Sequence, residues 1–182
     1  HTVDGSLYLA GDVPAEWVFG VLGPARSLDV IEQRRIAEFP EYDPKTKRWS
    51  GDPGCLTYTA QLENGVFLSH LPAITDLRWE IVCANGTIRI VDNNDSLHLF
   101  KRRGTSYSFD PVPLETIAPA SSHVALVEDL LRCMRTNEKP LANEVAARNG
   151  MEILMGCAAS HQQGGCKVKL PLEDRAMYIP SH

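Results

Sequence analysis

Short runs of alternating apolar and polar residues, separated by Asn-Gly pairs, occupy the middle of the chain. Alternation with a period of two is typical of a half-buried strand, and Asn-Gly favours a tight hairpin because both residues tolerate positive φ. The runs that flank Asn64-Gly65 and Asn85-Gly86 are Leu56–Leu62, Val66–Pro72, Arg78–Ala84 and Thr87–Asp92. With a further strand at Leu97–Arg102, this pattern predicts an antiparallel meander of about five strands.

A two-residue turn at each Asn-Gly pair would fix the register of both hairpins. In the first hairpin it places Thr59 opposite His70, and in the second it places Ile81 opposite Ile90. One face of the second hairpin is then apolar, with Trp79, Ile81, Cys83, Ile88 and Ile90. The reverse face mixes apolar and polar groups as an interface does, with Thr59, Gln61, Leu68, His70, Glu80 and Arg89.

Helical spacing of apolar residues appears at both ends of the chain. The opening residues 1–10 carry Val3 and Leu7 on one stripe, and a strand is expected at Trp17–Leu22. The connection from residue 24 to 54 shows little periodicity apart from a short helix near 29–37. Two helices follow the hairpins, with the stripes Val124, Val127, Leu130, Leu131 and Met134, and Ala147, Met151, Leu154, Met155 and Ala158.

Strands in one block, followed by helices, predict an α+β fold. We expect a mainly antiparallel open β-sheet with helices packed on one face. A chain of 182 residues fits one domain, and its 43% hydrophobic and 23% charged residues are typical of a globular protein.

Charge and cysteine content narrow the range of partners. A net charge of −5 gives no reason to expect nucleic acid or an anionic membrane, and no apolar run reaches the length of a membrane span. The odd number of cysteines, without a CxxC pair, predicts reduced thiols, a cytoplasmic location and no metal site.

Candidate chemistry in the residues themselves is sparse. No dinucleotide fingerprint, phosphate loop or nucleophile elbow is present, so no cofactor site is predicted in this chain. His1 and Asp4 lie three apart and would share one helix face, where the carboxylate can orient the imidazole, although a frayed end would carry the same residues. His70 is a second candidate for binding a ligand, against the alternative of a surface histidine with ordinary partners.

Three separated segments resemble the C-terminal half of the Gfo/Idh/MocA oxidoreductases, a family named for glucose–fructose oxidoreductase, inositol dehydrogenase and a rhizopine catabolism protein. The opening segment is similar to the helix G-x-H-x-x-D…L-x-G, and the second hairpin to the motif E-I-x-G-x-x-G-T-L-x-I, with Asn85 where the family often has glycine. The matching segments are His1–Asp4 with Tyr8–Gly11, Glu80–Ile90, Lys139-Pro140, Ala159-Ser160 and Val168–Pro171.

This resemblance implies that residues 1–182 are the C-terminal substrate and oligomerisation domain of an NAD- or NADP-dependent enzyme acting on a sugar, polyol or cyclitol. By motif position, His1 is the catalytic histidine that helps to move a hydroxyl proton, and Asp4 orients it or contacts substrate. His70 is assigned to substrate binding. The family's N-terminal Rossmann domain, with its lysine, is absent from this sequence, so the isolated chain is expected to bind no cofactor and to be inactive.

Two functional hypotheses therefore remain open. The first is a dehydrogenase domain that takes a small-molecule substrate and forms a homo-oligomer through its open sheet face. The second is a stand-alone, non-catalytic domain that binds a ligand or a protein through the same face.

Overall fold

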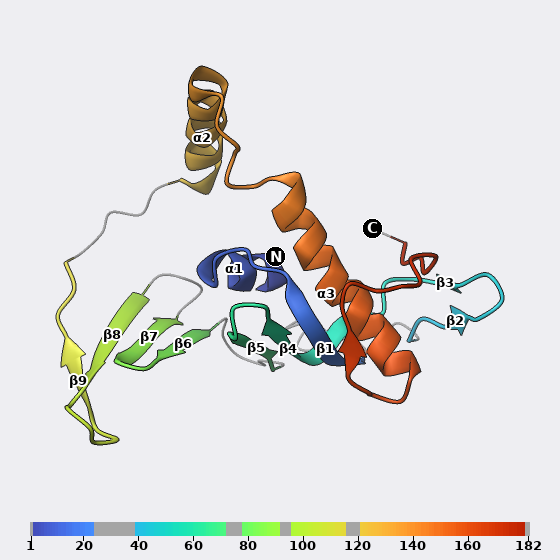
Figure 1. Ribbon diagram of the computed structural model, residues 1–182, viewed down its shortest axis with the longest axis horizontal. Coiled ribbons are helices and arrows are strands. Elements are labelled where there is room, and N and C mark those ends of the chain that lie inside the picture. Colours follow the sequence, from blue (N-terminus) through green and yellow to red (C-terminus); the bar gives the residue numbers. More distant parts are fainter. Residues whose placement is uncertain (1, 24–38, 72–77, 92–95, 116–120, 181–182) are drawn as a thin grey trace, which may run out of the picture. The chain divides into compact units, whose positions relative to one another are not determined.

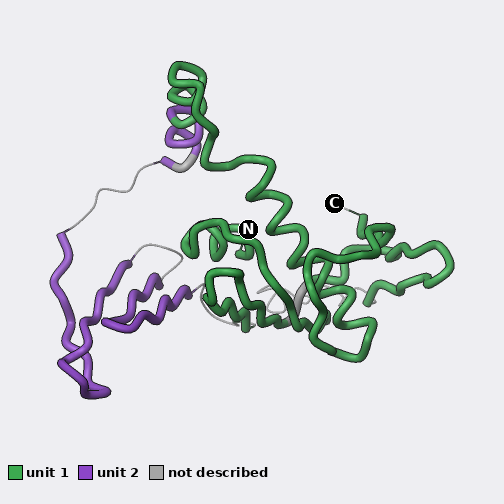
Figure 2. Tube along the Cα trace, viewed as in Figure 1, with its two compact units in different colours: residues 1–72, 129–182 green, residues 73–128 purple. Residues whose placement is uncertain are grey.

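The computed structural model describes residues 2–23, 39–71, 78–91, 96–115 and 121–180. It contains three helices and antiparallel sheets of four, two and four strands, so the expected α+β fold with an open antiparallel sheet is confirmed (Figure 1). Contacts group the chain into two compact units, residues 1–72 with 129–182 and residues 73–128 (Figure 2). Each unit is described by itself.

The larger unit is built on a four-stranded sheet with the order β10-β1-β4-β5. Its strands are β1 (Ala15–Leu22), β4 (Cys55–Leu62), β5 (Phe67–His70) and β10 (Val168–Lys169). Helix α3 (Glu144–Gln162) packs on β1, and α1 (Thr2–Leu9) packs on α3. At the centre of the core between helices and sheet, no surface is exposed on Leu7, Val18, Ala60, Leu62, Ile153 or Cys157. As expected, Val3 and Leu7 are the buried residues of α1.

Helix α3 approaches β1 unusually closely because glycines stand at the contact. A Cβ at Gly20 would lie 2.8 Å from the Cβ of Cys157, and a Cβ at Gly156 would lie 2.5 Å from Cγ1 of Val18. The buried face of α3 consists mainly of small residues, with Ile153 as its one large apolar side chain. The predicted stripe was therefore wrong in part, since Ala147 and Met151 are exposed while Ala158 is buried.

Side chains at the end of α3 accept hydrogen bonds from backbone N–H groups of β1 that no described strand pairs. Strand β10 pairs only with Trp17 and Val18. Beyond it, the Gly20 N–H donates to Ser160 Oγ at 3.0 Å, and the Leu22 N–H donates to His161 Nδ1 at 3.3 Å. Ser160 Oγ in turn donates to the Cys166 carbonyl at 2.5 Å, which ties the glycine turn after α3 to the same point.

The first hairpin differs from its prediction by one residue of register. The structure pairs Tyr58 with His70 and Thr59 with Ser69, where a two-residue turn would pair Thr59 with His70. Its loop has three residues, because the Leu62 N–H bonds to the Val66 carbonyl while Gly65 has φ +82°. A slip of one residue exchanges the faces, so Leu68 and His70 point to the helix-covered side.

The smaller unit is an antiparallel four-stranded sheet in sequence order. Its strands are β6 (Trp79–Cys83), β7 (Gly86–Val91), β8 (Ser96–Arg102) and β9 (Phe109–Val112). The turn after β6 is at Ala84-Asn85, which shifts the register by two residues from the prediction. Trp79 is therefore paired with Ile90, where Ile81 was expected. An even shift preserves the faces, and the apolar face predicted for this hairpin is confirmed. The hairpins therefore belong to two different sheets, whereas one meander was expected.

The two long helices begin and end near their predicted positions. Helix α2 (Ser122–Thr136) carries the expected stripe, but its members are exposed, up to 74% for Met134. Helix α3 begins at its N-cap Asn143, whose Oδ1 accepts from the backbone N–H groups of Val145 at 2.9 Å and Ala146 at 3.2 Å. The predicted helix near 29–37 lies outside the described residues.

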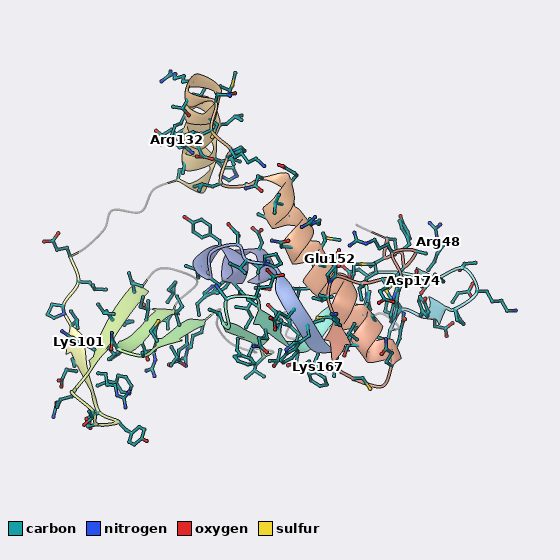
Figure 3. All side chains as sticks on the ribbon, viewed as in Figure 1. Arg48, Lys101, Arg132, Glu152, Lys167 and Asp174 are labelled. Carbon is teal, nitrogen blue, oxygen red and sulfur yellow. The ribbon has the colours of Figure 1, made fainter. Side chains whose placement is uncertain are left out.

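A C-terminal segment packs back onto the larger unit beside the small hairpin β2 (Tyr42–Asp43) and β3 (Arg48–Trp49). The Trp49 N–H donates to the Tyr178 carbonyl at 3.0 Å, and the Tyr178 N–H donates to the Lys47 carbonyl at 2.9 Å. Ion pairs join Lys47 to Asp174 at 2.5 Å and Arg175 to Glu152 at 2.9 Å; Figure 3 labels Asp174 and Glu152. Within the described part of the chain, no helix combines the length and apolar character needed to cross a membrane.

Candidate functional site

The first candidate site is the exposed side of α1. Val3 and Leu7 bury one face of this helix, and that orientation leaves Asp4 exposed. Ser6 stays within the helix, where its Oγ donates to the Thr2 carbonyl at 2.8 Å. No hydrogen bond or ion pair engages the Asp4 carboxylate among residues 2–23 and the other described segments. The structure thus places this acid on the exposed side of α1.

His70 ends β5 on the helix-covered side of the sheet, not on the open face where sequence reasoning placed it. Its imidazole stacks on the ring of Tyr58, with centroids 5.6 Å apart and planes 11° apart. Burial lowers the pKa of His70 from its ordinary value. The ring is therefore neutral at pH 7, with one nitrogen that donates and one that accepts hydrogen bonds.

The predicted site residues keep separate positions in the structure. His1, the predicted proton-transfer residue, lies outside the described residues. Asp4 stands on a helix and His70 on the strand at one edge of the sheet, and the hydrogen bonds of the described residues do not join them. Their assignment to catalysis and substrate binding stays a prediction.

The open face of the β10-β1-β4-β5 sheet carries an aromatic cluster that was not among the predicted site residues. Trp17 Nε1 donates to Gln61 Oε1 at 2.7 Å, and the indole meets Phe67 edge-on at 6.1 Å. The Lys167 ammonium, labelled in Figure 3, lies 4.2 Å from the centre of the Trp17 ring. Phe19 and Phe67 remain 37% and 61% exposed. The signal for this cluster was the alternation within residues 15–22, which marks a strand with only one covered face.

A second aromatic cluster surrounds Trp49 on the covered side of the larger unit. Phe39, Tyr42 and His161 each lie within 6.4 Å of the Trp49 ring, centroid to centroid. Trp49 is 5% exposed, and its indole N–H has no acceptor among the described residues. This N–H is the one buried side-chain donor of the described residues that lacks a protein partner.

Polar residues of the smaller sheet form an exposed ion pair and not a closed pocket. Arg89 Nε donates to Glu80 Oε1 at 2.9 Å, and the guanidinium lies 5.2 Å from the ring centre of Phe100. Both partners of the pair are more than 40% exposed. Over the described residues, no group of three His, Cys, Asp or Glu side chains is placed to hold a metal ion.

Comparison with known proteins finds relatives by structure only. No family model matches the sequence, and no curated protein matches it. The structure is similar to aldose-aldose oxidoreductase from Caulobacter crescentus, with a TM-score of 0.63, 15% identity, and coverage of 93% of this chain and 45% of that chain.

Two further similar structures are dehydrogenases whose descriptions mention a nucleotide sugar. The UDP-N-acetylglucosamine 3-dehydrogenase GnnA from Acidithiobacillus ferrooxidans matches with a TM-score of 0.55, 18% identity, and coverage of 89% of this chain and 48% of that chain. The WlbA dehydrogenase from Bordetella pertussis, solved with NADH and UDP-GlcNAcA, matches with a TM-score of 0.53, 16% identity, and coverage of 95% and 44%.

The chain thus spans somewhat less than half the length of each of these oxidoreductases. At such identities the likeness establishes the fold. The fold expected from the three sequence motifs is therefore confirmed.

Proposed function

We propose that this chain, which has the fold of the C-terminal domain of the Gfo/Idh/MocA-type oxidoreductases, is the substrate and oligomerisation domain of an NAD(P)-dependent enzyme. The substrate is a sugar, polyol or cyclitol that exchanges a hydride between its hydroxyl or carbonyl carbon and the nicotinamide. One observation carries the proposal: nine-tenths of the chain superimposes on about half of several sugar oxidoreductases. The dinucleotide belongs to the other half of such an enzyme.

The exposed side of α1 supports the assignment of the proton-transfer residues. Residues three apart share a helix face, so His1 would stand on the same side of α1 as the exposed Asp4. The carboxylate would hold the imidazole in one orientation and stabilise its protonated form while the substrate hydroxyl loses a proton. His70, neutral at pH 7, would offer a hydrogen bond to a substrate hydroxyl.

The decisive experiment compares this chain with the longest open reading frame that contains it. NADH and NADPH are titrated into both proteins by fluorescence, and turnover is measured on a panel of aldoses, polyols and cyclitols. We expect binding and turnover in a longer protein and neither in this chain. If no protein containing this chain binds a dinucleotide, the proposal is wrong.

Substitution of the helix acid refines the same test in the active protein. Asp4→Asn should lower kcat/KM by about tenfold or more, the equivalent of about 1.4 kcal/mol of transition-state stabilisation. Glu173→Gln, an exposed acid in the C-terminal segment, is the matched control and should leave kcat/KM unchanged. Equal values for Asp4→Asn and the unaltered enzyme would remove Asp4 from the mechanism.

The open face of the larger sheet supports homo-oligomer formation as the second part of the proposal. Phe19 and Phe67 expose apolar surface beside Trp17, and an exposed group of aromatic residues is typical of an interface. Light scattering should give a dimer or larger assembly for this chain. Phe67→Glu should convert it to a monomer, whereas Tyr107→Glu, at a more exposed aromatic residue in the smaller unit, should not.

The same face favours the alternative of a non-catalytic binding domain. A folded monomer, in a protein that binds neither dinucleotide nor sugar, would support that alternative and contradict the enzyme. The open aromatic face would then bind a different protein or ligand.

A further inference from the structure

The end of β1 is held by a histidine. The Leu22 N–H, at the last residue of the strand, donates to Nδ1 of His161 at 3.3 Å. The imidazole is fixed between aromatic rings, 5.9 Å from Phe39 in an edge-on contact and 6.4 Å from Trp49. The pairing of β1 with β4 is irregular between Val21 and Leu22, so the ladder on the other side of β1 is also interrupted at this place.

We propose that His161 is a proton-sensitive latch, which fixes the C-terminal end of β1 to the end of α3 at neutral pH and releases it in acid. An imidazole accepts a hydrogen bond at Nδ1 only when that nitrogen carries a lone pair, so the neutral ring must have its hydrogen on Nε2. Protonation puts a hydrogen on Nδ1 as well. The Leu22 N–H then faces another donor, and the bond is lost.

The neighbouring hydrogen bond, from the Gly20 N–H to Ser160, serves as an internal control for the effect of pH. Ser160, one residue earlier in α3, accepts from the Gly20 N–H at 3.0 Å with a hydroxyl that does not titrate. Acid should therefore release residue 22 while residue 20 stays bonded. The change is confined to the last residues of the strand, and the rest of the sheet is retained.

Other titratable groups on the packed elements belong to different chemical classes. These groups are Tyr42 and Asp43 in β2, Arg48 in β3 and Cys157 one turn earlier in α3. Carboxyl groups ordinarily titrate near pH 4, and thiol, phenol and guanidinium groups above pH 8. In the described segments no carboxylate is hydrogen-bonded or ion-paired to the His161 ring.

Two NMR measurements on the full 182-residue chain test the latch. The tautomer of His161 is read at pH 7.5 from its ring nitrogen shifts, and amide protection factors of Gly20 and Leu22 are measured from pH 5 to 7.5. We expect the Nε2–H tautomer and a protection factor for Leu22 that falls about fivefold on acidification, the equivalent of one net hydrogen bond. The protection of Gly20 should not change. An Nδ1–H tautomer at pH 7.5, or parallel changes at both amides, would overturn the proposal.

Two variants distinguish the effect of protonating His161 from the effect of packing its ring. His161→Asn places an acceptor oxygen close to the position of Nδ1 without a group that titrates, and Leu22 should stay protected at every pH. His161→Phe keeps the ring but offers no acceptor, so Leu22 should show low protection at every pH. A pH-dependent Leu22 amide in either variant would contradict the latch.

Discussion

At the end of α3, the neighbouring side chains of Ser160 and His161 take the place of a strand partner for β1. Strand β10 stops opposite Val18, and these two residues satisfy the next backbone N–H groups on that edge. Ser160 is fully buried and bonds twice, once as acceptor and once as donor to Cys166. A buried hydroxyl with both roles filled stabilises the sheet edge and the turn after α3 together.

Removing the Ser160 hydroxyl should therefore lower the free energy of unfolding. Ser160→Ala leaves the buried Gly20 N–H and the Cys166 carbonyl without partners, so we expect a loss of about 1–3 kcal/mol in the free energy of unfolding. Urea denaturation measures it. Ser69→Ala, on the exposed side of β5, is the control and should change the stability by less than about 0.5 kcal/mol. Equal effects of the two substitutions would mean that the Ser160 bonds contribute nothing net.

His70 should titrate below an ordinary histidine. Burial lowers its pKa, so between the lowered folded value and the ordinary unfolded value near 6.5 the unfolded chain binds more protons than the folded one. Its contribution to stability is thus complete above the unfolded pKa and decreases as the pH falls. Proton NMR should place the midpoint of His70 below 6.5, and Tyr58→Leu, which removes the stacked ring, should raise it. A midpoint above 6.5 would contradict this assignment.

Among the elements, the two hairpins and the helices followed from the sequence, whereas the registers and the strands β2, β3 and β9 did not. The alternation around Asn64-Gly65 located the hairpin, yet Glu63 also belongs to its loop, and that one residue moved His70 to the other face of the sheet. The period of α3 was similarly recognisable. Its buried side was not, because sequence reasoning favours the largest apolar residues whereas the close approach at Gly20 and Gly156 selects the small ones.

The start of α3 depends on its N-cap. Asn143→Ala removes the Oδ1 that accepts from the N–H groups of Val145 and Ala146, and should lower the free energy of unfolding by about 1 kcal/mol. Asn143→Asp retains an acceptor and should be nearly neutral. Thermal unfolding followed by circular dichroism distinguishes them, and an Asn143→Ala protein as stable as Asn143→Asp would show that the cap is unimportant.

At the scale of the whole chain, the C-terminal segment closes the larger unit. Met177 and Ile179 pack against its core, and the backbone of Tyr178 bonds on both sides to the β2–β3 hairpin. Residues 176–180 follow a proline and three exposed charged residues and carry no periodic pattern in the sequence. The apolar contacts of this segment come from residues far apart in sequence, which local patterns do not reveal.

Removing residues 173–182 should destabilise the larger unit by about 2 kcal/mol or more, from the lost burial of two apolar side chains and the bonds of Tyr178. Hydrogen exchange should show the loss first at the amide of Trp49, which donates to Tyr178. Arg175→Ala, which removes only a part-exposed ion pair, is the control and should cost less than about 1 kcal/mol. Unchanged exchange at Trp49 after truncation would contradict this role.

The close contact of Gly20 with Cys157 also has an evolutionary consequence. Because a Cβ at position 20 would lie 2.8 Å from that of residue 157, the two positions share one fixed volume. A lineage that acquires alanine at position 20 must move the helix away from the sheet, because the Cα of residue 157 would lie 2.9 Å from the new Cβ whatever side chain residue 157 carries. Cys157→Gly removes the Cβ and Sγ of residue 157 but leaves its Cα 2.9 Å from the new Cβ, so it should rescue Gly20→Ala only in part in a selection for folded protein.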